Sequence, residues 1–225
     1  MLETAFFNHD AKHVAISLLG KIIRHRYNNT WLSSQIIETE AYYAREKGSH
    51  SSLGFTQKRK AMFMPPGTIY MYYARGADSL NLSVKGEGNA VLIKSAIPYT
   101  DTRSPVSTIQ IMQHLNPVAN SNKKRPVDKL CSGQTLLCRS LHLKVGEWDQ
   151  QVFNINKFYI ETTGQPVTKY IQTTRLGIPA GRDEHLMYRF IDYTHRKVCT
   201  QNPLTRRNHL EGTHYYVKHN VSSSR

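Results

Sequence analysis

The segment Ile36-Ile37-Glu38-Thr39-Glu40-Ala41-Tyr42 determines how the rest of the chain is interpreted. Two apolar residues lead into a pair of carboxylates, and an aromatic residue follows. Side chains alternate between the two faces of a strand, so Glu38, Glu40 and Tyr42 are predicted to point the same way. A carboxylate next to an aromatic ring suits a site that needs a base beside a flat ligand. The pattern also fits an edge strand with a solvated acidic end.

The residues around this segment predict two hairpins and an N-terminal helix. Apolar residues at helical spacing before Gly20 predict a helix over about 9–19. Strands over 21–27 and 31–43 flank Asn28-Asn29-Thr30, which has the composition of a hairpin turn. A second hairpin is predicted from strands over 68–73 and 80–84.

The second half of the chain has weaker patterns. They predict a helix over about 105–115, a short helix within 131–141, and strands over 152–161, 170–174 and 188–191. Residues 201–225 are polar and basic with little to bury, so we expect a basic polar tail after a single domain of residues 1–200. This succession predicts an α+β fold, with a curved, mostly antiparallel sheet, surrounding helices and a protruding hairpin.

Charge and composition limit the function classes. The 225 residues include 30 Lys and Arg against 16 Asp and Glu, a net charge of +14. This excess indicates a polyanionic partner, either nucleic acid or an acidic membrane surface. No window contains the roughly 18 apolar residues of a membrane span, and the N-terminus does not resemble a signal peptide. Three cysteines without C-x-x-C spacing favour reduced thiols in the cytoplasm, and we expect no metal and no cofactor.

The order and spacing of several residues resemble the alkyladenine (3-methyladenine) DNA glycosylase family of base-excision repair. The residues that carry the resemblance are Glu40-Ala41-Tyr42, Ser49-His50-Ser51, Met62-Phe63, Pro66-Gly67-Thr68-Ile69-Tyr70-Met71-Tyr72, Asn81 and Ala90-Val91-Leu92-Ile93-Lys94. The resemblance covers roughly residues 5–195.

The resemblance implies a monofunctional enzyme of DNA repair that acts on double-stranded DNA. Its substrates would be flipped-out alkylated or deaminated purines, of the 3-methyladenine, 7-methylguanine or hypoxanthine type. Hydrolysis of the N-glycosidic bond would leave an abasic site. We expect a monomer that does not bind membranes and works in the cytoplasm, or in the nucleus if the source is eukaryotic.

The chemistry of base excision fits these residues. A base that leaves the DNA stack needs aromatic faces in the pocket, which Tyr42, His50 and Tyr72 can supply. Many alkylated purines carry a positive charge, which an electron-rich ring attracts further. A carboxylate can stabilise the oxocarbenium-like transition state and accept a proton from water. The family places this glutamate two residues before the first stacking tyrosine, which implies Glu40 and leaves Glu38 a structural role.

Further roles follow from the resemblance. Lys94 stands where the family usually has an arginine, and with the backbone carbonyl of Leu176 it would hold the attacking water. A lysine on a strand could instead form a Schiff base. Asn81 would lie against the purine edge, or only cap its hairpin. Gln134 replaces a proline of the family pattern.

Two groups of residues are predicted to contact DNA. Lys58, Arg59 and Lys60 form a basic cluster, either a phosphate clamp or a solvated helical turn. Arg75 is predicted at the hairpin tip, where the family usually inserts a tyrosine into the minor groove. The tip is one residue shorter than in the family, and Asp78 adds a negative charge.

Two other functions remain open from the residues alone. One is a non-catalytic DNA-binding protein on the same scaffold. The other is a nucleoside or glycoside hydrolase that uses Glu38 and Glu40 as a pair, with carboxylates about 6–7 Å apart by strand rise.

Overall fold

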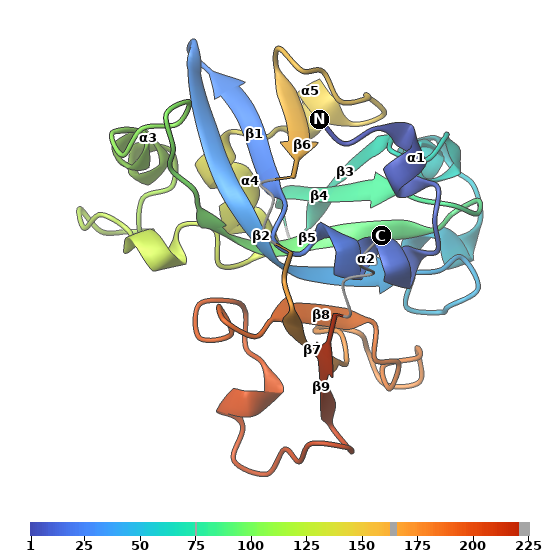
Figure 1. Cartoon of the computed structure of the whole chain (residues 1–225). Coiled ribbons are helices and arrows are strands. Elements are labelled where there is room, and N and C mark those ends of the chain that lie inside the picture. Colours follow the sequence, from blue (N-terminus) through green and yellow to red (C-terminus); the bar gives the residue numbers. More distant parts are fainter. Residues whose placement is uncertain (75, 163–165, 221–225) are drawn as a thin grey trace.

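The structure is a computed structural model that describes residues 1–74, 76–162 and 166–220 (Figure 1). Arg75 lies outside the described residues, so its place at the hairpin tip stays a prediction. The described strands form a nine-stranded sheet in which every pairing is antiparallel. The expected α+β class with a mostly antiparallel sheet is therefore confirmed.

The sheet is organised around β2 (Thr30–Tyr42), which pairs with three other strands. The strand order of the sheet is β3-β4-β5-β2-β8-β7-β9. β1 pairs with the first half of β2, and β6 pairs with β1. The other strands are β1 (Ile22–Tyr27), β3 (Ile69–Ala74), β4 (Ala77–Ser83), β5 (Ala90–Pro98), β6 (Phe158–Glu161), β7 (Lys169–Thr173), β8 (Arg189–Asp192) and β9 (Tyr215–His219). The second half of β2 lies between β5 and β8, which places Glu40 in the middle of the sheet.

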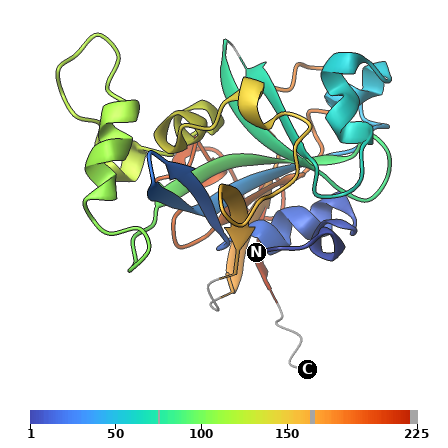
Figure 2. The ribbon, with the colours of Figure 1, turned by 90° about the horizontal axis from the view of Figure 1, so that it is seen from above.

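Helices cover both faces of the sheet (Figure 2). They are α1 (Thr4–Phe7), α2 (Ala11–Leu18), α3 (Thr108–Leu115), α4 (Gln134–Leu141) and α5 (Val145–Trp148), with shorter 3-10 turns η1 (His50–Leu53), η2 (Gln57–Phe63), η3 (Val127–Lys129) and η4 (Pro203–Thr205). α2 and α4 lie on opposite faces. Asp10 caps α2 by accepting hydrogen bonds from the N–H groups of Lys12 and His13, as expected for an N-terminal aspartate.

The first hairpin agrees with its prediction. Strands over 21–27 and 31–43 are observed as β1 and β2, and both turn residues, Asn28 and Asn29, have positive φ angles of 44° and 61°. Asparagine tolerates this left-handed conformation, and two such residues in succession form the turn that matches the twist of a hairpin. The second predicted hairpin is also present, as β3 and β4.

Two expectations for the second half of the chain differ from the structure. The strand predicted over 152–161 is limited to β6, because Asn154 forms a turn in which its side chain accepts the N–H of Asn156. The segment after residue 200 is not only a polar tail. Its β9 pairs with β7 along all five residues, and Tyr215 packs against a small cluster that includes Ile171.

Candidate active site

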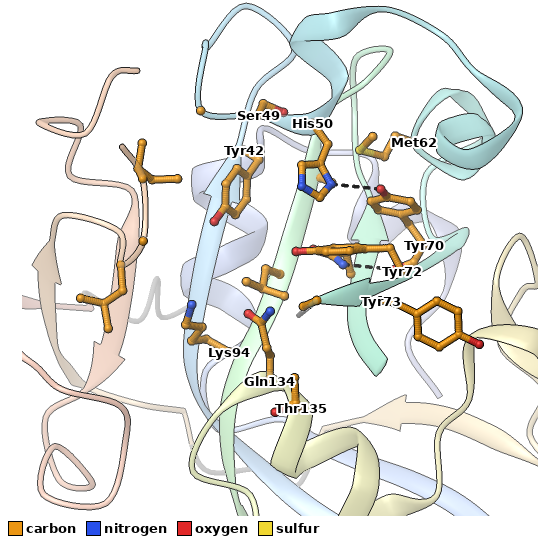
Figure 3. Close-up of a pocket in the computed structure, with 18 of the residues that line it drawn as sticks. Tyr42, Ser49, His50, Met62, Tyr70, Tyr72, Tyr73, Lys94, Gln134 and Thr135 are labelled. Atoms are coloured by element: carbon orange, nitrogen blue, oxygen red, sulfur yellow. Dashed lines mark hydrogen bonds between the residues drawn. The ribbon is translucent and has the colours of Figure 1, made fainter. Parts of the chain in front are cut away.

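A cavity of about 940 Å³ lies between the β3–β4 hairpin, the start of α4 and two loops, 44–53 and 175–182 (Figure 3). Six of the predicted site residues line it: Tyr42, His50, Tyr72, Asn81, Lys94 and Leu176. They come from β2, β3, β4, β5 and both loops, so the fold brings together residues that are more than half the chain apart. The volume is in the range of pockets that enclose a small organic ligand.

Glu40 lies in the wall behind the cavity, where it is fully buried. Its Oε2 accepts a short hydrogen bond of 2.6 Å from the Tyr42 hydroxyl. Its Oε1 lies 3.4 Å from Nζ of Lys94 and accepts a 3.4 Å hydrogen bond from the N–H of Leu176. All three partners line the cavity, so the carboxylate lies directly behind its lining. Because both contacts of Oε1 are long, Oε1 is the oxygen with capacity to accept another proton donor.

Leu176 contacts Glu40 through its backbone N–H. The resemblance assigns the backbone carbonyl of Leu176 to the attacking water, and that role stays a prediction. Burial, followed by the charge of Glu40, raises the pKa of Tyr42 well above its ordinary value. The hydroxyl therefore stays protonated and acts as the donor in its bond with Glu40.

Aromatic side chains line the cavity on two sides (Figure 3). Tyr42 stands on one side and His50 on the other, with Tyr72 beside His50 at a centroid distance of 4.5 Å and stacked on Tyr70 at 5.5 Å. The His50 ring nitrogen Nδ1 lies 3.2 Å from the Tyr70 hydroxyl. Burial, followed by the charges of Arg59 and Arg182, lowers the pKa of His50. A neutral imidazole beside two phenol rings is a surface on which a flat, electron-poor ring stacks well.

Asn81 and Gln134 both border the cavity. The side-chain amide of Asn81 donates to the Tyr70 carbonyl across the hairpin at 3.3 Å, so it holds the hairpin and faces the cavity at once. Gln134, at the first position of α4, points into the cavity near Lys94 and Tyr72 (Figure 3). Its Oε1 has no hydrogen-bond partner among the described residues.

Glu38 is a structural carboxylate outside the cavity. It is fully buried and accepts from Nε of Arg189 at 2.6 Å, from Ser95 at 2.6 Å and from the backbone and hydroxyl of Thr200. Burial alone would raise the pKa of Glu38, but Arg189, Ser95 and Thr200 hold it below its ordinary value. None of these partners lines the cavity. The structure therefore contradicts the hydrolase interpretation that pairs Glu38 with Glu40, because an arginine already neutralises Glu38.

Arg175 is a central residue that the sequence analysis did not identify. Its side chain is 1% exposed and lies 2.6 Å from Glu46, and it donates to the Ala41 carbonyl at 3.0 Å. Its guanidinium group covers the rings of Tyr42 and Tyr188 at 4.5 and 5.7 Å. The only sequence signal was its place directly before Leu176, which does not show that it reaches a loop about 130 residues earlier.

Further contacts join the loops on either side of Tyr42. Nε of Arg182 donates to the Lys47 carbonyl at 2.9 Å, and the Lys47 N–H donates to Asp183 at 2.8 Å. The backbones of the two loops approach so closely that a Cβ atom on Gly48 would lie 2.9 Å from the Arg182 carbonyl oxygen. The absence of a side chain at position 48 therefore permits this contact.

The basic cluster occupies η2, beside the cavity but outside its lining. Lys58 and Lys60 are exposed, while Arg59 is partly buried and donates to the Gly54 carbonyl at 3.1 Å. Within the described ranges, no group of three His, Cys, Asp or Glu side chains could hold a metal ion. No helix in the described part of the chain is long and apolar enough to cross a membrane.

Comparisons with known proteins match nearly the whole chain. Residues 5–196 match a family described as Methylpurine-DNA glycosylase (MPG). A protein of Pseudomonas savastanoi pv. phaseolicola is 58% identical over 214 residues, which are 95% of both chains. A protein of Pseudomonas aeruginosa strain LESB58 is 54% identical over 96% of this chain and 90% of its own. A protein of Carboxydothermus hydrogenoformans is 31% identical over 84% and 94%. All three bear the name "Putative 3-methyladenine DNA glycosylase".

Proposed function

The chain belongs to the methylpurine-DNA glycosylase family, and from this premise we propose that it excises alkylated or deaminated purines from duplex DNA by hydrolysing their N-glycosidic bond. Family membership confirms the resemblance seen in the sequence. The observation that supports the proposed reaction most directly is the position of Glu40. Its carboxylate is held by Tyr42, Lys94 and Leu176 at the wall of an aromatic cavity.

The proposed reaction uses both the ring surfaces and the carboxylate. The damaged base enters the cavity and stacks between Tyr42 on one side and His50 with Tyr72 on the other. The bond between C1′ of the sugar and the base then breaks, and the base leaves with the bonding electrons. The negative charge of Glu40 stabilises the developing oxocarbenium ion, and its Oε1 accepts a proton as the water oxygen bonds to C1′.

Lys94 has a supporting role in this proposal. Its ammonium group lies 3.4 Å from Oε1 of Glu40 and its side chain is 14% exposed, on the lining of the cavity. From there it can donate a hydrogen bond to the attacking water and orient it beside Oε1 of Glu40. A lysine offers a single charged centre where an arginine would offer a planar fork, so the water has fewer fixed donors here.

Binding to DNA is proposed to depend on charge outside the cavity. The net charge of +14 supports phosphate contacts, and the exposed amines of Lys58 and Lys60, with Arg59, are placed beside the cavity. Asn81 is proposed to contact the edge of the purine. Because the relatives above are bacterial, we propose that the protein acts on DNA in the bacterial cytoplasm. We also propose that it acts as a monomer.

Two variants separate the roles of the neighbouring glutamates. Glu40→Gln keeps the size of the side chain but removes its charge, so we expect excision to be lost while binding to a lesion duplex persists. Glu38→Gln leaves Arg189 buried without its counter-charge, so we expect a destabilisation of about 3–5 kcal/mol with excision retained per folded molecule at low temperature. Release of 3-methyladenine, 7-methylguanine, hypoxanthine and ethenoadenine from duplexes measures excision, and urea unfolding measures stability.

The outcomes of this experiment discriminate between functions. Loss of excision in both variants without loss of stability would contradict the assigned roles. Tight binding of lesion duplexes by the unmodified protein without release of any base would instead identify a non-catalytic DNA-binding protein.

A further inference from the structure

Tyr42 contacts opposite charges at two places. Its hydroxyl donates to the carboxylate of Glu40, and the guanidinium group of Arg175 lies over its ring at 4.5 Å. Tyr42 lines the cavity and Arg175 does not, so the arginine covers the ring face that is turned away from the cavity. A base stacked on the other face would lie about 3.5 Å from the ring, hence about 8 Å from the guanidinium carbon.

The charge of Arg175 is only partly offset by its surroundings. Glu46 contacts Nη1 at 2.6 Å, and this nitrogen also donates to the Ala41 carbonyl. The Nε and Nη2 groups have no acceptor among the described residues. The Arg175 and Glu46 side chains are 1% and 4% exposed, so water screens the pair poorly. A purine in the cavity is therefore separated from a buried cation by only one aromatic ring.

We propose that Arg175 is a specificity-determining residue, whose charge, opposed by Glu46, sets how strongly the cavity favours cationic over neutral damaged purines. Stacking on tyrosine attracts a cationic base such as 7-methylguanine, and the guanidinium behind the ring works against this attraction. A neutral base such as hypoxanthine is only weakly attracted by the tyrosine ring and only weakly repelled by the guanidinium group. The Arg175–Glu46 pair thereby broadens the range of lesions that the cavity accepts, since a pocket of tyrosines alone would favour cationic bases more strongly.

This inference rests on the proposed glycosylase function and is tested by a ratio of two rates. The quantity is kcat/KM for 7-methylguanine divided by kcat/KM for hypoxanthine, measured on one preparation with both lesions in the same duplex sequence. Loss of folded protein lowers both rates equally and cancels in the ratio. A role limited to holding Tyr42 or the loops in place would also lower both rates together.

Variants of the two residues should move the ratio in opposite directions. A buried charge about 8 Å away, partly offset by Glu46, corresponds to roughly a fivefold effect on the ratio. Arg175→Met should therefore raise the ratio about fivefold, and Glu46→Gln should lower it by a similar factor. Arg175→Lys retains the charge and should stay near the ratio of the unmodified protein.

Distinct results would overturn each inference. If Arg175→Met and Glu46→Gln both leave the ratio within about twofold, or shift it in the same direction, the charge of Arg175 does not determine specificity. If the unmodified protein releases neither these two bases nor 3-methyladenine or ethenoadenine, the proposed glycosylase function itself fails.

Discussion

At the scale of single residues, Tyr42 connects the proposed base-binding surface with the proposed catalytic carboxylate. Its ring lines the cavity, its hydroxyl fixes one oxygen of Glu40, and Arg175 covers its rear face. The hydrogen bond of 2.6 Å to Oε2 leaves Oε1 as the oxygen that faces the proposed water. Orientation of a catalytic carboxylate by a neighbouring hydroxyl is a contribution that stacking alone does not provide.

Tyr42→Phe separates these two contributions. Phenylalanine retains the stacking surface but lacks the hydroxyl group, so the carboxylate loses its short hydrogen bond. A hydrogen bond to a charged group contributes about 1.5–3 kcal/mol, so we expect kcat to fall about 10-fold to 100-fold with little change in lesion binding. Single-turnover excision and duplex titration measure the two quantities.

The neighbouring residue supplies a matched control. The Tyr43 hydroxyl donates to Asp10 at 2.8 Å, away from the cavity lining. Tyr43→Phe should therefore lower stability and leave kcat unchanged. An equal loss of kcat in both variants would show that the Tyr42 hydroxyl has no special part in the reaction.

His25 gives the fold a defined pH dependence. The residue is 5% exposed, and burial lowers its pKa to about 4 although its Nδ1–H donates to the Leu141 carbonyl at 2.7 Å. In the unfolded chain an ordinary histidine binds a proton below about pH 6.5. Between about pH 4 and 6.5 the unfolded state thus binds more protons than the folded state, so stability falls as the pH decreases through this window.

The size of this effect is measurable. From about pH 7.5 to about pH 5, His25 should remove about 2 kcal/mol of stability. His25→Phe removes the titrating group and leaves the carbonyl of Leu141 unpaired, so it should lower stability at pH 7.5 by about 1–3 kcal/mol. The variant should lose less stability on acidification than the parent. Urea unfolding at both pH values tests this, and equal losses in the two proteins would exclude His25 as the source.

At the scale of elements, Asp78 attaches the β3–β4 hairpin to the start of α5. The sequence placed Asp78 near the tip, where a negative charge would repel DNA. In the structure Asp78 accepts the N–H of Val145, the first residue of α5, at 2.9 Å and lies 3.4 Å from Nζ of Lys144. Its charge is thus used within the protein, and the hairpin is attached at the start of α5.

Asp78→Ala should loosen this attachment. The N–H of Val145 loses its acceptor, so we expect a destabilisation of about 1–2 kcal/mol and faster hydrogen exchange at that amide. Binding of lesion duplexes should weaken as well, because the hairpin carries Tyr72 and Asn81 into the site. Asp78→Asn retains an acceptor and removes only the partly exposed ion pair with Lys144, so it should be close to the parent. If Asp78→Ala leaves exchange at Val145 unchanged, the hairpin is held by other contacts.

At the scale of the whole molecule, the C-terminal segment completes the sheet outside the region matched by the family. The match ends at residue 196, whereas β9 begins at Tyr215 and pairs with β7. Tyr215 packs against a cluster that includes Ile171 and Ile191. Ile191 belongs to β8, and β8 pairs with residues 38–40 of β2. The C-terminal segment therefore packs against the strands behind the candidate active site.

Removal of residues 211–225 tests this support. The unpaired edge of β7 and the exposed cluster should lower stability by about 2 kcal/mol, or about 4–8 °C in Tm for a chain of this size. Excision at low temperature should persist, because none of the described residues of the segment, 211–220, lines the cavity. Lys218→Gln, an exposed change within β9, serves as the control. An unchanged Tm in the truncated protein would show that β9 contributes nothing to stability.

Short-range patterns made much of this architecture predictable. Alternation and the Asn28-Asn29 turn indicated the first hairpin, and the resemblance to the glycosylase family indicated six of the residues that line the cavity. Arg175 and Glu46 were missed because their contact depends on two loops that only the finished sheet brings together. β9 was missed because its residues are mostly exposed and polar, and its pairing uses backbone groups that no side-chain pattern reveals.

The absence of a side chain at position 48 has a consequence for redesign. The backbone there touches the opposite loop at a distance where even one methyl group would collide with the Arg182 carbonyl. That collision would push the two chains apart along the side of the cavity that holds His50. An engineer who wants the protein to accept bulky, ring-fused adducts could thus begin at Gly48, where alanine would separate the two loops while every aromatic residue of the lining is kept.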